Sequence, residues 1–377
     1  MKKVLFLVFP ILLLASCKIY VTRAFLYNDP GIQDNKIMPV RIVKAGKPQP
    51  LITSPGYMDF HAPDSLMHLL KRTHTVAFLV MRNDSILYEW YARGYSDSSL
   101  TNPFSATKSI VSILTGIALK DGKIKSLDEP VCDYYPPYRK KGLDKITFKN
   151  LLCMSSGVNF RDSYLNPAGP TSQIYYGDNM RGLIDSFYAE RPAGTFFRYK
   201  NCDPEILTLA LQNAVGMNMS DYASQKLWKP IGADHDAQWI VDKPDSAGVE
   251  KSYCCFHTDA RDIARIGILY EHKGNWRGYQ LVDSAYVDAS LTPHRLPTEQ
   301  GKPTNNYGYF WWIRGGNANK NFSADGLKGQ YVGVMPEQHL IFVRLGKRDW
   351  LKPGQRFKEP KKLYPILSAE VQAIWGK

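Results

Sequence analysis

The sequence of 377 residues predicts a mixed α/β fold of the α+β kind, in which one antiparallel sheet is formed from both ends of the chain. Three observations predict it. Runs of β-branched and aromatic residues bounded by turn residues occur near the start, at 76–80 and 86–91, and again after residue 306. Between them the pattern is of helical pieces separated by polar loops. We therefore expect helices packed on the sheet and an inserted, mainly helical lobe at about 122–255.

The first seventeen residues have the pattern of a bacterial lipoprotein leader. Lysines at positions 2 and 3 precede an apolar run at 4–14 that is too short for a confident membrane-spanning helix. The Leu-Ala-Ser-Cys that follows resembles a lipobox, in which cleavage leaves Cys17 as a lipidated N-terminus. We expect residues 1–17 to be this leader and the protein to be lipid-anchored in the bacterial cell envelope, facing the periplasm or the exterior. A plain signal peptide with an incidental cysteine, or an uncleaved anchor, is the alternative.

Residues 18–70 are irregular and rich in proline, and we interpret them as a tether followed by a strap over the main domain, 71–377. That domain opens with a hairpin, whose two strands are joined at Asn83-Asp84. A helix follows, because Pro103 lies just before an apolar stretch at 110–120 and a glycine lies just past its end.

The remaining elements are predicted from the same signals. Two clear helical pieces, at 148–154 and 204–215, are each followed by a glycine. A further helix is expected at 259–270, with Thr258 as its N-cap. Strands return late in the chain and an amphipathic helix closes it. These late elements are strands at 307–313, 330–335 and 339–345 and a helix at 361–375.

A serine and a lysine three residues apart begin the helix after Pro103. Positions i and i+3 share a helix face, so the Lys108 amine can lie beside the Ser105 hydroxyl. The first helical turn favours negative charge near Ser105 and, together with burial, disfavours a protonated lysine. A neutral lysine beside a serine is a base beside its nucleophile. Taken alone, the short pattern also fits an ordinary helix start.

A second motif is Tyr199-Lys200-Asn201. A tyrosine can relay a proton between a serine and a leaving group, and an asparagine two residues later can hydrogen-bond Lys108 and a substrate amide. The same short pattern recurs at 164–166, and its plain alternative is a tyrosine packed at the edge of a loop.

A third segment, Ala324-Asp325-Gly326-Leu327, leads into a late strand. Gly326 would let a substrate approach the strand backbone closely, and the N–H that follows could point at an oxyanion. By itself the segment could also be a hairpin turn. The aromatic residues of 307–313 could line a pocket nearby, although one face of that strand is expected to be core.

These segments, in this order, resemble the serine β-lactamase and penicillin-binding-protein superfamily. The resemblance is closest to its class C-like branch, which includes 6-aminohexanoate-dimer hydrolases and related esterases, and it runs from about 75 to 345. It implies the β-lactamase/transpeptidase-like fold. The matching segments are 104–109, 122–128, 150–157, 194–201, 259–265 and 329–332 with Pro336.

The resemblance implies a role for each site residue. Ser105 would attack a carbonyl and Lys108 would accept its proton. Tyr199 would relay that proton to the leaving group, and Asn201 would orient Lys108 or the substrate. The backbone N–H groups of Ser105 and Leu327 would form the oxyanion hole. Two further substrate contacts are implied, at Tyr164 and Gly326.

The chain departs from the superfamily at the last strand. Penicillin-recognising members usually carry Lys-Thr-Gly or His-x-Gly there, and the matching triplet here is Ala324-Asp325-Gly326. Replacing a cation by an acid should weaken recognition of a substrate carboxylate, so efficient β-lactam hydrolysis is not expected. Lys200, inside the Tyr-x-Asn motif, could restore positive charge near the site.

The charge and the cysteine content limit which binding partners and cofactors are expected. The formal net charge is +13, but there is no nucleic-acid motif, and anionic lipid or cell-wall polymer explains a basic face on an exported protein better. Besides Cys17 there are five cysteines, whose spacing fits neither a disulfide framework nor a zinc site. We expect them to be buried apolar residues and do not expect Cys254 and Cys255 to pair. No metal or cofactor is predicted, and the sequence does not indicate an oligomeric state.

Three functions are compatible with these features. We predict a lipid-anchored serine hydrolase that cleaves small amides or esters through an acyl-enzyme on Ser105. A cell-wall peptide hydrolase, acyltransferase or penicillin-interacting enzyme is the alternative. A non-catalytic binding lipoprotein is disfavoured, because such a protein has no need for Ser105, Lys108 and Tyr199 together.

Overall fold

The large sheet joins the two ends of the chain, as the sequence predicts. The computed structural model describes residues 19–27, 29–163, 166–315, 320–348 and 363–376. Its seven-stranded sheet has the order β2-β4-β3-β12-β11-β10-β9, and neighbours are antiparallel except for the pair β2 and β4. The strands are β2 (Ile52–Thr53), β3 (Thr75–Arg82), β4 (Ser85–Tyr91), β9 (Trp312–Ile313), β10 (Phe322–Gly326), β11 (Gln330–Met335) and β12 (Leu340–Gly346).

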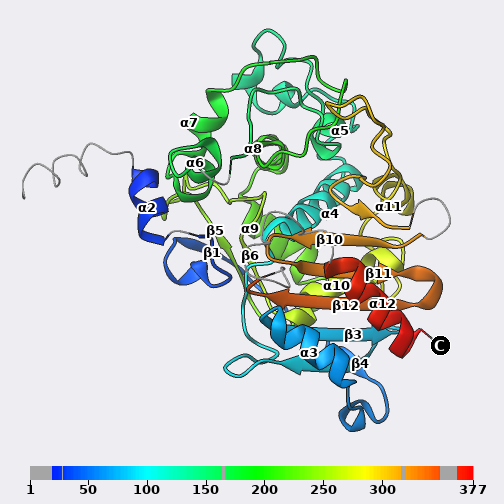
Figure 1. The fold of residues 1–377 in the computed structure, drawn as a ribbon. Helices are drawn as coiled ribbons and strands as arrows, with labels where there is room; N and C mark the ends of the chain where they lie inside the picture. The colour runs from blue at the N-terminus through cyan, green and yellow to red at the C-terminus, as the bar shows by residue number, and fades with distance from the viewer. Residues whose placement is uncertain (1–18, 28, 164–165, 316–319, 349–362, 377) are drawn as a thin grey trace, which may run out of the picture.

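The centre of this sheet is buried on both faces. Strand β3 alternates between two cores: Phe78 and Val80 face one, and Leu79 and Met81 face the other. Four helices supply the partner surfaces. Helices α3 (Asp64–Arg72) and α12 (Leu363–Trp375) cover the first face, and α4 (Thr107–Lys120) and α10 (Ala260–Glu271) cover the second. In Figure 1, α3 and α12 are drawn in front of the strands and α10 behind them. The predicted closing helix and hairpin are confirmed.

The middle of the chain forms the predicted helical lobe, which lies at the top of Figure 1. Its longest helix, α8, ends at Gly216, whose φ of 72° is the left-handed conformation that glycine adopts most readily. The helices of the lobe are α5 (Phe148–Leu152), α6 (Pro170–Tyr176), α7 (Met180–Asp185), α8 (Cys202–Val215) and α9 (Met219–Ala223). Helix α11 (Ser284–Ser290) follows later in the chain and packs on α4.

The N-terminal strap is more regular than its composition suggests. It begins with helix α2 (Ile19–Tyr27), which packs on α6, and continues into β1 (Val40–Val43). Strand β1 pairs with β5 (Ala237–Ile240), and β5 pairs with β6 (Phe256–His257). The prediction of an irregular strap was therefore wrong, because tertiary pairing turns a short apolar run into the edge of a second sheet.

Two local predictions are also corrected. Only Trp312–Ile313 of the expected strand 307–313 is extended, because the chain turns back at Gly308 and Phe310, the latter with a φ of 60°. The N-cap of α10 is Asp259, whose carboxylate accepts the Asp262 N–H, and not Thr258.

The cysteine prediction is partly wrong. Cys254 and Cys255 form a disulfide bond with each other, whereas the other three described cysteines are free and buried, as expected. The free cysteines are Cys132, Cys153 and Cys202. The leader, including Cys17, lies outside the described residues. Among the described residues, no helix is long and apolar enough to cross a membrane.

Candidate active site

Ser105 lies in a single 3₁₀ turn, Phe104–Ala106, which leads directly into α4. Phe104 has a φ of 47°, and its N–H is held by the side-chain oxygen of buried Asn102 at 2.8 Å. The same Asn102 oxygen accepts the N–H of Cys255, so the turn is tied to the segment that leads to α10. The neighbours of Ser105 on both sides are buried, while Ser105 itself remains partly exposed. The turn therefore presents one hydroxyl to the solvent-accessible side.

Lys108 is placed beside this hydroxyl as the i, i+3 spacing predicts. Its Nζ lies 2.9 Å from Ser105 Oγ, 2.9 Å from Asn201 Oδ1 and 2.8 Å from the Tyr253 carbonyl oxygen. The side chain is only 1% exposed. Burial lowers the pKa of Lys108 to about 7, against the opposing effect of the Asp162 and Glu205 carboxylates. A large fraction of the amine is therefore neutral at physiological pH.

Tyr199 lies above the lysine. The centroid of its ring is 5.0 Å from Lys108 Nζ. The ring stacks on Trp312 at 5.8 Å with an interplanar angle of 24°, and meets Tyr307 edge-on at the same distance. Tyr307 is buried core, whereas Trp312 is half-buried like Tyr199. Two aromatic faces therefore border the site.

Asn201 is held by Asp162, a residue that belongs to none of the predicted motifs. Asp162 accepts the backbone N–H of Asn201 at 3.1 Å and its side-chain amide N–H at 2.6 Å. With the amide nitrogen engaged in this way, the oxygen of Asn201 faces Lys108. Burial raises the pKa of Asp162, while Lys108 and the Asn201 N–H groups lower it. Asp162 lies two residues before Tyr164, and Tyr164 lies outside the described residues.

Asp162 should therefore set the pH at which the lysine becomes neutral. In Asp162→Asn the negative charge near Lys108 is lost, so the pKa of the amine should fall further below about 7. The acidic limb of the kcat/KM profile should move to lower pH. Thr171→Val is the matched control, since it removes a weaker contact to the same carboxylate, at 3.4 Å, without changing charge. An unchanged limb in Asp162→Asn would contradict this positioning role.

Gly326 packs against the serine turn. A Cβ at Gly326 would lie 2.0 Å from the carbonyl oxygen of Pro103, so only glycine lets the end of β10 approach this turn. Gly326 thus admits the chain's own backbone, and its expected contact with a substrate stays a prediction. Leu327 follows directly and is half-buried. This close packing brings the N–H-bearing backbone after β10 to the vicinity of Ser105.

Gly326→Ala should displace β10 from the turn, because the obstructing atom belongs to the backbone. A misplacement of about 1 Å in such a site costs roughly 10²-fold in rate, and we expect a loss of that order in kcat/KM. Gly267→Ala is the control, since its Cβ would meet only side-chain carbons at 3.1–3.3 Å. Wild-type activity in Gly326→Ala would show that the contact is not needed.

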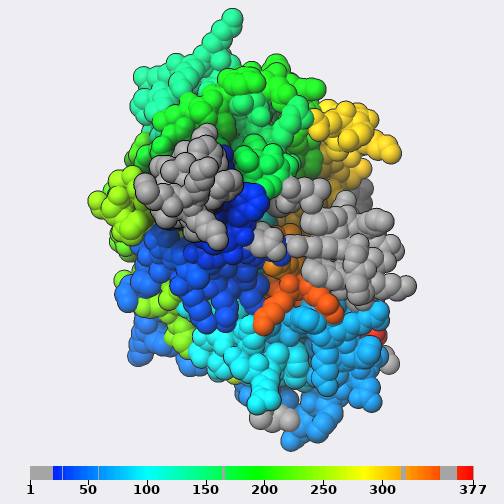
Figure 2. All heavy atoms as spheres, turned by 60° about the vertical axis from the view of Figure 1, so that its left-hand side comes forward, coloured from blue at the N-terminus to red at the C-terminus, as the bar shows by residue number. Residues whose placement is uncertain are grey.

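The loop after β10 is fixed by the N-terminal strap. Lys328 Nζ pairs with Asp29 at 2.9 Å and donates to the carbonyl oxygen of Pro30 at 2.5 Å. Lys328 is 8% exposed and has a φ of 64°. Figure 2 shows the dark-blue N-terminal segment beside the orange segment on one face of the molecule. A strap far away in sequence therefore helps to position Leu327.

Asp325 and Lys200 are the two charged residues that the sequence analysis considered near the site. In the structure, each is engaged by other partners and not by Ser105. Asp325 is on the opposite face of β10 from Ala324, where it pairs with Arg314 and accepts the Ser323 hydroxyl at 2.6 Å. The Asp325 carboxylate is therefore engaged by Arg314 and Ser323, and the expected weak recognition of a substrate carboxylate stays a prediction. Lys200 is buried in the helical lobe, where its Nζ donates to Ser156 Oγ at 2.8 Å and lies 3.7 Å from Asp203.

Histidines and carboxylates take structural positions in the part of the chain that the structure describes. His257 is fully buried, accepts the Asn35 N–H and has a pKa lowered by burial to about 4, so it stays neutral. His235, Asp259 and Asp262 lie close enough to hold a metal ion. Their oxygens already accept backbone N–H groups and the Arg265 guanidinium, which explains the cluster without a metal.

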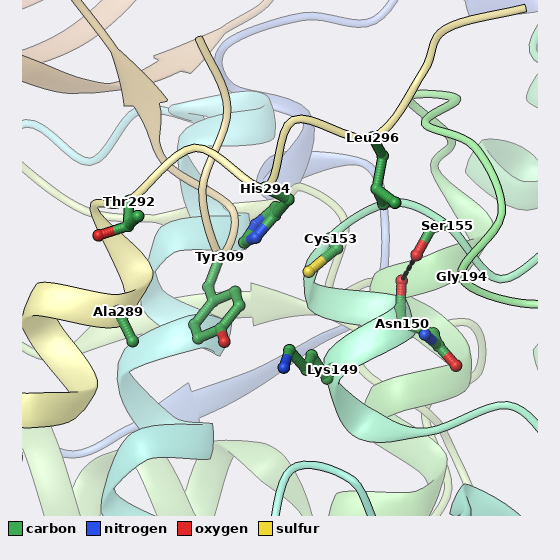
Figure 3. Close-up of a pocket in the computed structure, with 10 residues that line it drawn as sticks. All are labelled: Lys149, Asn150, Cys153, Ser155, Gly194, Ala289, Thr292, His294, Leu296 and Tyr309. Carbon is green, nitrogen blue, oxygen red and sulfur yellow. Dashed lines mark hydrogen bonds between the residues drawn. The ribbon is translucent and has the colours of Figure 1, made fainter. Parts of the chain in front are cut away.

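A cavity of about 450 Å³ lies between α5 and the segment after α11 (Figure 3). Figure 3 shows the rings of Tyr309 and His294 and the amine of Lys149 around it, and the Ser155 hydroxyl bonded to the Asn150 carbonyl. None of Ser105, Lys108 and Tyr199 lines it. The chemistry therefore places the active site at the Ser105 turn and not in this cavity.

A serine next to a buried lysine of lowered pKa, at the junction of an antiparallel sheet and a helical lobe, defines a serine hydrolase. The chain belongs to the Beta-lactamase family, whose model matches residues 65–356. It is 26% identical to the 6-aminohexanoate-dimer hydrolase of Paenarthrobacter ureafaciens over 314 residues, 78% of this chain and 77% of that protein.

Solved structures agree on the fold. A Bacillus anthracis protein provisionally assigned as a 6-aminohexanoate-dimer hydrolase has a TM-score of 0.75 at 19% identity, with 90% of this chain and 92% of that chain covered. A family VIII carboxylesterase has a TM-score of 0.60 at 16% identity, with coverage of 83% and 98%. The predicted family and fold are thereby confirmed.

Proposed function

We propose that Ser105 is the nucleophile of an acyl-transfer reaction in which small amides or esters are hydrolysed. One observation carries the proposal: the buried amine of Lys108 lies 2.9 Å from Ser105 Oγ while Asn201 and Tyr253 supply its other two partners. A neutral amine can donate both its hydrogens to Asn201 and Tyr253 and keep its lone pair for the Ser105 hydroxyl. This is the arrangement that a general base requires.

The steps follow from these positions. Ser105 Oγ bonds to the substrate carbonyl carbon as Lys108 takes the hydroxyl proton. The negative charge on the former carbonyl oxygen is received by the backbone N–H groups of Ser105 and Leu327. Collapse breaks the bond to the amine or alcohol, which leaves with a proton relayed through Tyr199. A water molecule then attacks the acyl-enzyme carbonyl and gives up its proton to Tyr199 and Lys108. The bond to Ser105 Oγ breaks, Ser105 takes the proton back and the acid is released.

Small amides and esters are favoured by the walls of the site. The ring of Tyr199, which lies 5.0 Å from Lys108 Nζ and stacks on Trp312, gives the site an apolar wall. The strand position where penicillin-recognising relatives usually carry a cation is Ala324, which is fully buried. The relative from Paenarthrobacter ureafaciens is named for hydrolysis of a 6-aminohexanoate dimer. A cell-wall peptide hydrolase or acyltransferase is the second candidate, favoured by membership of the family and by an exported location.

We further propose that the protein is an envelope lipoprotein. The support is the basic, apolar and Leu-Ala-Ser-Cys sequence that ends at Cys17 and the net charge of +13, which suits an anionic surface. Mass spectrometry of the N-terminal peptide of membrane-purified protein tests it. A diacylated Cys17 is expected, and an unmodified or uncleaved N-terminus would contradict the anchor.

Two covalent probes test the chemistry. Purified protein is treated in parallel with a fluorophosphonate, whose fluoride is displaced by a serine nucleophile, and with a penicillin. We expect one phosphonate adduct at Ser105 and no penicilloyl adduct. Adducts from both reagents would favour the cell-wall candidate. No adduct with either would contradict the proposed hydrolase chemistry.

A further inference from the structure

Helix α2 is a fixed part of the molecular surface. Tyr20 and Ala24 are buried, and the Tyr20 hydroxyl donates to the Ala168 carbonyl oxygen at 3.2 Å. Arg23 donates to the Tyr176 carbonyl oxygen at 3.0 Å. Figure 1 shows α2 at the left-hand edge of the molecule beside α6. The helix therefore has one face bound to the helical lobe and another turned outward.

The C-terminal end of α2 exposes large apolar side chains. Phe25 is 71% exposed and Leu26 is 72% exposed, and Tyr27, which follows, is 39% exposed. Single exposed apolar residues are common on soluble proteins, but three consecutive large ones on one short helix call for a partner. Tyr27 keeps one ring face on Tyr176 at 6.2 Å, so the patch is held in place by the body.

The chain length places this patch next to the proposed anchor. One residue, Lys18, separates Cys17 from Ile19, the first residue of α2, and these two residue steps span at most about 7 Å. The helix rises about 1.5 Å per residue, so Leu26 lies within roughly 18 Å of the Cys17 backbone. A lipid on Cys17 would therefore bring the whole of α2 to the surface of the bilayer.

We propose that Phe25, Leu26 and Tyr27 form a bilayer-contact surface that inserts at the headgroup–acyl boundary of a phospholipid membrane. The proposal rests on the envelope location given above and deepens it, since it assigns the face on which the protein sits. Aromatic and aliphatic side chains exposed at the end of a surface helix suit this boundary. The full chain has a formal net charge of +13, and loss of Lys2 and Lys3 with the leader leaves 13 − 2 = +11, which complements anionic headgroups. A second copy of the chain is the competing occupant.

A single fluorescent label tests the contact. The protein is expressed from the full chain with Leu26→Cys, labelled with the environment-sensitive fluorophore NBD and reconstituted in phosphatidylcholine–phosphatidylglycerol vesicles. Labelling is selective because the free cysteines Cys132, Cys153 and Cys202 are buried. Tyr279→Cys is the matched control, because Tyr279 is a large side chain exposed to a similar extent, 66%, on another element, β8. Hydrolysis of an ester by each labelled protein verifies folding.

We expect blue-shifted emission at position 26, with at least about twofold quenching by spin-labelled lipid, and neither effect at position 279. Equal quenching at both positions, or none at 26, would overturn the proposal. A blue shift at 26 that appears without vesicles and grows with protein concentration would assign the patch to a second copy instead. Mass spectrometry of Cys17 is independent of the label, so a lipidated protein with an unquenched position 26 keeps its location and loses only this contact.

Discussion

Ser105→Ala is expected to lower kcat/KM by at least about 10³-fold, because the alanine variant cannot form the acyl-enzyme. The melting temperature should change by no more than about 3 °C, since the residue is partly exposed and loses one hydrogen bond, from Lys108. Kinetics with a chromogenic ester and a thermal melt measure the two quantities. The fluorophosphonate adduct should disappear with the activity.

Ser109→Ala is the matched control for this variant. Ser109 lies one turn further along α4, is buried, and donates to the Phe310 carbonyl oxygen at 2.7 Å. Its loss leaves a buried acceptor without its donor, so the protein should melt at a lower temperature while the folded fraction keeps its activity. Near-wild-type turnover in Ser105→Ala, or a loss of equal size in both variants, would refute Ser105 as the nucleophile.

Lys108→Met should lower kcat/KM about as much as Ser105→Ala does, and it should also change how kcat/KM depends on pH. Below pH 7 the wild-type amine is protonated and has no lone pair for the Ser105 proton, so wild-type kcat/KM should rise as pH passes through about 7. The methionine variant should lose about 10³-fold in rate above that pH. The limb near pH 7 should be absent from whatever activity remains, as measured across pH 5–9 with the same ester.

Lys200→Met separates this effect from the general loss of a buried lysine. Lys200 lies in the same Tyr-x-Asn segment but bonds to Ser156 and Asp203. Removing it leaves Asp203 without its cation, which should cost about 3–5 kcal/mol of folding free energy. In the folded Lys200→Met protein, kcat/KM should still rise as the pH passes through about 7. If Lys108→Met retained the limb, Lys108 would not be the titrating base.

The elements that could be predicted from sequence are those with a local signal. The hairpin of β3 and β4 has two apolar runs around Asn83-Asp84, and α4 lies between Pro103 and Gly122. Both signals depend on neighbours in the chain. Strand β1 has no such signal, because four residues of a proline-rich segment become a strand only through pairing with β5. Sequence reasoning could not supply that partner.

The residues of the candidate site also fall into those that the sequence predicts and those that it does not. Ser105 and Lys108 are joined by helical spacing, and Asn201 was expected to contact the lysine and does so. Asp162 and the Tyr253 carbonyl were not found, because each reaches Lys108 or its partner only through the folded arrangement of loops. The partners of Asp325, Arg314 and Ser323, were not predicted either, since the sequence alone does not show which face of the sheet a strand residue occupies.

The bonds between Lys328 and the strap give the N-terminal segment a second role, besides connecting the body to its proposed anchor. The residues that connect the body to its proposed anchor are the same ones that clamp the loop on the oxyanion side of Ser105. A protease that clips the chain after Pro30 would therefore separate the body from the proposed anchor and loosen its active site in one cut. Shedding and inactivation would be a single event, and enzyme freed in this way would not act far from the cell that made it.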